Sequence, residues 1–174
     1  MKYVMKAGTL YFNDVVSARI KGAFMEPKKK IYSANGTMLM HTDILNLEVP
    51  PNETSNVRFR QYVLFDGNEN KCAIACPDYA EGDDPAVFGW PLCRMPRVDH
   101  AKVMIGERGY MLVMQNNQNY SLSEMSGKTI MQIFHRGLGG GWDIEAVEDC
   151  VPEMICGIFV FCKYIEQENE FLVV

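Results

Sequence analysis

The side chains of this chain that could act as nucleophiles or metal ligands are its cysteines and histidines. Six cysteines and three histidines are spread along the sequence, with no CxxC pair, no zinc-finger spacing and no HExxH motif. Cys72 and Cys76 are expected on one face of a strand, where about 13 Å between their Cα atoms excludes a disulfide. We therefore predict structural thiols, and expect no metal and no cofactor. The six are Cys72, Cys76, Cys93, Cys150, Cys156 and Cys162.

A catalytic site would have to be assembled from distant residues. His135, Asp143 and Cys93 have suitable chemistry, but no local spacing joins them. The glycine-rich segment 137–141 precedes a predicted strand, whereas a phosphate-binding loop needs a helix N-terminus or a GK[ST] ending. We therefore predict that the protein is not an enzyme, and a dispersed enzyme site remains an alternative.

Two charged segments are candidates for ligand binding. Lys28, Lys29 and Lys30 form a local basic cluster, and near a membrane each cation contributes about 1 kcal/mol toward anionic lipid. A lysine run that enters a strand also commonly protects an exposed sheet edge. The acidic segment 77–85 lacks the ligand spacing of an EF-hand, so it is predicted to be a solvated loop.

Composition bounds the class of protein. The 174 residues include 17 Lys or Arg and 22 Asp or Glu, a net charge of −5 that argues against a nucleic-acid partner. Residues 1–174 are expected to form a single domain with one core. The first residues lack the apolar region of a secretory signal, and the longest apolar run, 154–162, is too short for the roughly 20 residues that cross a bilayer. The reducing cytoplasm is the expected location.

Short alternating segments separated by turn residues recur to about position 147, which is typical of an antiparallel barrel or sandwich. Asn35-Gly36 favours a type I′ hairpin, which would place Ala34 opposite Thr37 and Tyr32 opposite Leu39. In the segment 57–65, Phe59, Val63 and Phe65 would share one side, with Arg58 and Arg60 on the other.

Further strands are expected along the rest of the chain. The segment 71–76 places Cys72, Ile74 and Cys76 on one face, and the pattern breaks at Pro77. Short connections predict a meander of sequential antiparallel neighbours, and another strand then follows with Trp142, Ile144 and Ala146 on one face. The segments are 101–105, 109–115, 119–124, 128–135 and 142–147.

A helix is predicted from Pro152 to Glu166. Pro152 suits the first turn, Glu153 suits the positive helix end, and the polar residues 166–170 end the apolar stretch. The middle of this helix is apolar on every side, so protein must surround it. Its predicted core residues are Met154, Ile155, Ile158, Phe159 and Phe161. A buried strand is the alternative, because Gly157 weakens a helix by about 1 kcal/mol. Many strands with one such helix indicate a closed sheet wrapped around a central helix.

The order of these C-terminal segments resembles the tubby C-terminal-like superfamily, which includes the LURP-one-related proteins and the phospholipid scramblases. The resemblance covers Gly127–His135, the glycine-rich turn, Trp142–Val147, an acidic spacer and Met154–Ile165. It implies a closed, roughly twelve-stranded antiparallel barrel around a hydrophobic C-terminal helix. It also matches the length of the chain.

The resemblance implies function only coarsely. The tubby branch binds phosphoinositide head groups through surface Lys and Arg, but this chain has no matching basic motif. Scramblase activity is tied to a membrane-inserted segment and a calcium site. We therefore predict a non-catalytic intracellular binding or scaffold domain that binds a protein or an anionic ligand on its outer surface. A membrane module using Lys28–Lys30 is the alternative, and the oligomeric state is open.

Overall fold

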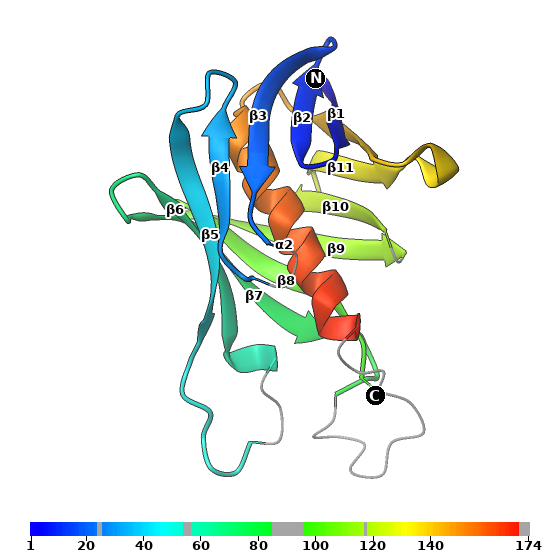
Figure 1. The fold of residues 1–174 in the computed structure, drawn as a ribbon. Coiled ribbons are helices and arrows are strands. Elements are labelled where there is room, and N and C mark those ends of the chain that lie inside the picture. The colour runs from blue at the N-terminus through cyan, green and yellow to red at the C-terminus, as the bar shows by residue number, and fades with distance from the viewer. Residues whose placement is uncertain (24–25, 54–56, 85–95, 117, 171–174) are drawn as a thin grey trace.

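The computed structural model contains twelve strands that close into an antiparallel barrel, followed by one long helix (Figure 1). It describes the chain except residues 24–25, 54–56, 85–95, 117 and 171–174. The strands are β1 (Lys2–Lys6), β2 (Thr9–Phe12), β3 (Val15–Lys21), β4 (Lys29–Ser33), β5 (Met38–Asn46), β6 (Arg60–Asp66), β7 (Lys71–Tyr79), β8 (Val98–Ile105), β9 (Arg108–Asn116), β10 (Asn119–Glu124), β11 (Thr129–His135) and β12 (Trp142–Ala146). Short 3-10 helices η1 (Val57–Phe59) and η2 (Gly137–Gly139) precede β6 and β12.

Each strand pairs with its neighbours in sequence, and the first and last strands pair with each other. Lys2 lies opposite Glu145, and Met5 lies opposite Trp142, so β1 and β12 complete the ring. The predicted meander from β8 to β11 and the strand after the glycine-rich turn are confirmed. The alternation of inward and outward side chains then sends one face of each strand toward the barrel interior.

Helix α2 (Pro152–Glu170) occupies that interior. It contacts β3, β4, β5, β6, β8 and β9, and it runs as the orange-to-red coil among the strands in Figure 1. Residues 155–162 are all buried, which means that every side of the helix is covered. Ile155, Ile158 and Phe161 are 0% exposed and Phe159 is 7% exposed, as predicted for core residues, while Met154 is partly buried against the same core.

The helix starts where the sequence predicts and ends later. The N–H of Ile155 donates to the carbonyl of Val151, so Pro152 occupies the first turn, where a missing N–H costs nothing. The predicted end at Glu166 is wrong, because the polar residues 166–170 continue the helix. Their side chains form hydrogen bonds with residues at the mouth of the barrel, as described below. No helix among the described residues is long and apolar enough to cross a membrane.

The hairpin between β4 and β5 differs from the prediction. Ser33, not Ala34, pairs with Thr37, and Tyr32 lies opposite Met38 instead of Leu39. Gly36 has a φ of +89°, but Asn35 does not have a positive φ. The loop is therefore a type I turn that ends in a left-handed glycine, which adds one residue compared with the type I′ turn.

Two strand predictions in the middle of the chain also need correction. Tyr62 and Leu64, which alternate with Val63 and so lie on the Arg60 side of β6, belong to the core around α2, and Phe59 lies in η1 instead of the strand. Pro77 does not break β7, because it pairs with Ala101 and the strand continues to Tyr79. The opposite face, with Cys72 and Cys76, is partly buried.

Candidate functional site

The basic cluster predicted at Lys28–Lys30 is divided by the alternation of β4. Lys30 is exposed, whereas Lys29 is partly buried and donates from Nζ to the Ala23 carbonyl. Desolvation by burial lowers the pKa of Lys29. Lys28 precedes the strand and is exposed. The three lysines therefore do not present their charges on one face.

The neighbouring strand β3 supplies other cations beside Lys30. Lys21 lies directly opposite Lys30, and Arg19 lies opposite Tyr32. Lys21 Nζ stands 5.0 Å from the centroid of the Tyr32 ring, and the Arg19 guanidinium donates to the Ala34 carbonyl at 2.9 Å. We call Arg19, Lys21 and Lys30 the basic face. None of the three forms an ion pair with a carboxylate in the described part of the chain.

Positive charge is concentrated in the N-terminal part of the chain. Residues 1–32 contain seven Lys or Arg and two Asp or Glu, a net charge of +5, although the whole chain carries −5. The remaining residues therefore carry −10. The alternation of Arg19 and Lys21 was visible in the sequence, but its proximity to Lys30 depends on the register of β3 against β4.

Of the three residues of the alternative enzyme site, the structure describes His135 and Asp143, and it does not bring these two together. His135 lies opposite Trp142, and its ring contacts the indole edge-on at 5.2 Å. Asp143 is the next residue on β12, which turns its side chain to the other face of the sheet, where it pairs with Arg136 at 3.4 Å. Cys93 lies outside the described residues.

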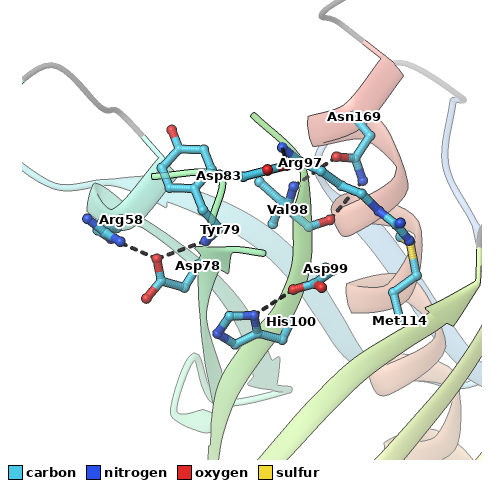
Figure 2. A network of polar contacts seen from close by, with 10 residues as sticks. All are labelled: Arg58, Asp78, Tyr79, Asp83, Arg97, Val98, Asp99, His100, Met114 and Asn169. Carbon is cyan, nitrogen blue, oxygen red and sulfur yellow. Dashed lines mark hydrogen bonds and ion pairs between the residues drawn. The ribbon is translucent and has the colours of Figure 1, made fainter. Parts of the chain in front are cut away.

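The acidic segment 77–85 takes part in a network with arginines at one end of the barrel (Figure 2). Arg58 bonds Asp78 at 2.7 Å and Asp84 at 2.8 Å, and its guanidinium lies 5.6 Å from the Tyr79 ring. These two carboxylates raise the pKa of Arg58, with the hydrogen bond that Arg58 donates to Asp78 as the largest cause. The part of this segment that the structure describes is therefore tied to η1 and is not simply a solvated loop.

The last turn of α2 is attached to the same end of the barrel. The Asn169 side chain accepts from the Val98 N–H and donates to the Val98 carbonyl, both at 2.9 Å (Figure 2). The N–H of Arg97 donates to Asp83 at 2.9 Å. These bonds satisfy backbone N–H and carbonyl groups at the beginning of β8, where the hydrogen bonds between strands end.

Two carboxylates of the helix contact tyrosines that point inward. Glu168 is 8% exposed and accepts from Tyr62 at 3.2 Å and from Arg60. Glu166 accepts from Tyr120 at 2.6 Å and from Lys163. Burial, with smaller contributions that include these carboxylates, raises the pKa of both tyrosines. This arrangement anchors the helix and keeps both phenols protonated.

The thiols in the described residues are free. Burial raises the pKa of Cys156 to about 12 and raises that of Cys162 well above its ordinary value. A protonated thiol inside the core is a poor nucleophile and a poor metal ligand. Cys156 and Cys162 therefore act as small apolar side chains of the helix, as the sequence predicts.

No protein-family model matches this chain, and no curated protein matches it. Among solved structures, the chain is similar to the X-ray structure of a protein from Arabidopsis thaliana, with a TM-score of 0.39 and 10% sequence identity. That match covers 94% of this chain and 91% of the Arabidopsis chain. A likeness at this level supports no argument about ligand or activity.

Proposed function

We propose that this chain is a non-catalytic binding domain that recognises an anionic partner through the basic face. The observation that carries the proposal is the pairing of Lys21 with Lys30 at exposed positions of β3 and β4, without a carboxylate partner in the described residues. Like charges directly opposite each other destabilise an antiparallel pair. A bound anion offsets the repulsion between Lys21 and Lys30, so the basic face is suited to binding an anion.

Three further features support an outer-surface binding role. The barrel interior is taken up by α2, so recognition uses outer strands, loops or rims. The overall charge of −5 argues against a general nucleic-acid partner. The free thiols favour a reducing, cytoplasmic location. We include in the proposal a kinship with the LURP-one-related proteins, supported by the order of twelve strands and one buried helix.

The test is binding of a fluorescently labelled polyglutamate peptide, followed by anisotropy. We expect affinity that falls with salt and drops at least about tenfold in Lys21→Glu/Lys30→Glu, because each surface charge contributes up to about 1 kcal/mol. Lys71→Glu/Lys102→Glu makes the same charge change at exposed positions on β7 and β8 and serves as the matched control. Equal losses in both variants, or no binding at all, would contradict the proposal.

A membrane surface is the second candidate partner. It is favoured because Arg19 and Lys21 join Lys30, and exposed Lys28 precedes the same strand, which gives more cations than the run Lys28–Lys30 alone. Each adds about 1 kcal/mol toward anionic lipid. Sedimentation with phosphatidylserine vesicles at rising salt distinguishes the candidates. Pelleting that the Lys21→Glu/Lys30→Glu change abolishes, without polyglutamate binding, would assign the basic face to a membrane.

A further inference from the structure

A polar hollow opens at the rim of the barrel where β8 begins, β9 turns into β10 and β11 ends. Its volume is about 690 Å³, which is within the range of small-molecule sites. Among the residues that the structure describes, the side chains that line it include one arginine and no carboxylate, and they come from Arg97, Gln115, Asn116, Gln118, Asn119 and His135. The basic face lies on other strands, β3 and β4, so this site is independent of the function proposed above.

Both asparagines at the hollow use their side-chain oxygens as acceptors for backbone N–H groups. Asn116 Oδ1 accepts the N–H groups of Gln118 and Asn119 at 3.3 and 3.1 Å, and Asn119 Oδ1 accepts the N–H of His135 at 2.8 Å. A backbone N–H can only donate, so these bonds fix which side-chain atom is the oxygen. The amide NH₂ groups remain without a partner in the described residues.

A hydrogen bond also fixes which ring nitrogen of neutral His135 carries the proton. Its Nδ1 accepts the N–H of Gly137 at 3.1 Å, which places the proton of the neutral ring on Nε2. The edge-on contact with Trp142 holds the ring plane. Nε2–H is therefore a third donor at the hollow that has no acceptor among the described side chains.

Arg97 supplies the positive charge. Figure 2 shows its side chain extending past the last turn of α2 toward Met114, where Nη2 lies 3.5 Å from the sulfur. A thioether is a weak acceptor, and the guanidinium carries five N–H donors. Arg58, Arg60 and Arg136 all pair with carboxylates, whereas Arg97 has no ion pair in the described part of the chain.

We propose that this hollow binds a small polar molecule that carries an oxyanion, a phosphate or a carboxylate. Arg97 contacts the charge, and the amides of Asn116 and Asn119 with Nε2 of His135 donate to the remaining oxygens. At Asn116, Asn119 and His135 an acceptor atom is already used by a backbone N–H, and the donors that remain select a ligand rich in acceptors. The volume leaves room beside the anion for a sugar or a similar polar group.

The test is titration of the ¹⁵N-labelled full chain with glucose 6-phosphate, inorganic phosphate, citrate and uncharged glucose. We expect saturable shifts of the amides of residues 116, 118, 119, 135 and 137 with the anions, and none with glucose. Stronger binding of citrate than of glucose 6-phosphate would assign a carboxylate ligand, and the reverse order a phosphate ligand. No saturable shift with any anion, or an equal response to glucose, would overturn the proposal.

Two variants test the roles of the side chains. Asn119→Asp keeps the oxygen that accepts the His135 N–H but replaces the donor by a negative charge, so binding should be lost while the free variant keeps its spectrum. Arg97→Gln should weaken binding about tenfold or more, because a charge-assisted contact is worth at least about 1.4 kcal/mol. Arg108→Gln removes the same charge from the opposite end of β9 and is the matched control. Equal losses in Arg97→Gln and Arg108→Gln, or unchanged binding in Asn119→Asp, would refute the site.

Discussion

Phe159 connects the buried helix with the strand that closes the barrel. Its ring meets Trp142 edge-on at 5.0 Å between centroids, and Lys163 Nζ lies 4.0 Å from the Trp142 ring centroid. The side chain is 7% exposed, so its removal leaves a cavity that the surrounding strands cannot fill by collapse.

We expect Phe159→Ala to lower the free energy of unfolding by about 3–5 kcal/mol, as for other large-to-small changes in protein cores. Urea denaturation followed by circular dichroism measures this loss. Leu138→Ala is the control, because Leu138 is fully exposed in η2 and the change should stay within about 0.5 kcal/mol. Unchanged stability in Phe159→Ala would contradict a core position for this ring.

At the scale of elements, the close approach of α2 to β6 explains a glycine inside a helix. A Cβ on Gly157 would lie 2.6 Å from Cδ2 and 3.0 Å from Cδ1 of Leu64, a side chain that is 0% exposed. Glycine costs a helix about 1 kcal/mol compared with alanine. Packing against β6 therefore outweighs helix propensity at this position.

Gly157→Ala should destabilise the protein, because overpacking costs about 1–3 kcal/mol against a propensity gain of about 1 kcal/mol. In a Leu64→Ala background the same change should be neutral or stabilising, since the colliding carbons are gone. A double-mutant cycle from urea titrations measures this coupling. Additive effects of the two substitutions would show that Leu64 is not the obstacle.

For the whole molecule, the buried thiols and phenols make stability depend on alkaline pH. Folding raises the pKa of Cys156 to about 12 and raises those of Cys162, Tyr62 and Tyr120, chiefly by desolvation. Each group is neutral when protonated and is held in that state by the native barrel. Its contribution is therefore complete below its unfolded pKa, near 9 for a thiol, and is lost as pH rises toward the folded value.

We expect the free energy of unfolding to fall above about pH 9, with about 1.4 kcal/mol per pH unit for each such group that the unfolded chain deprotonates. Urea titrations at several pH values measure the slope. In Cys156→Ala, the fall of the free energy of unfolding between about pH 9 and pH 12 should be less steep by the contribution of one such group. A slope identical to that of the unsubstituted protein would contradict the raised pKa of Cys156.

The sequence alone indicated most of the strands, the meander and the buried helix, because these follow from local periodicity and from an apolar stretch that is unfavourable in water. Tertiary contacts decided the rest. Residues 166–170 read as a polar end, but they stay helical because Tyr62, Tyr120 and Val98 bond their side chains at the barrel mouth. The basic face depends on the register of β3 against β4, and the rim hollow joins residues 97, 119 and 135. Such groupings arise from pairing between distant segments, which no local pattern of residues encodes.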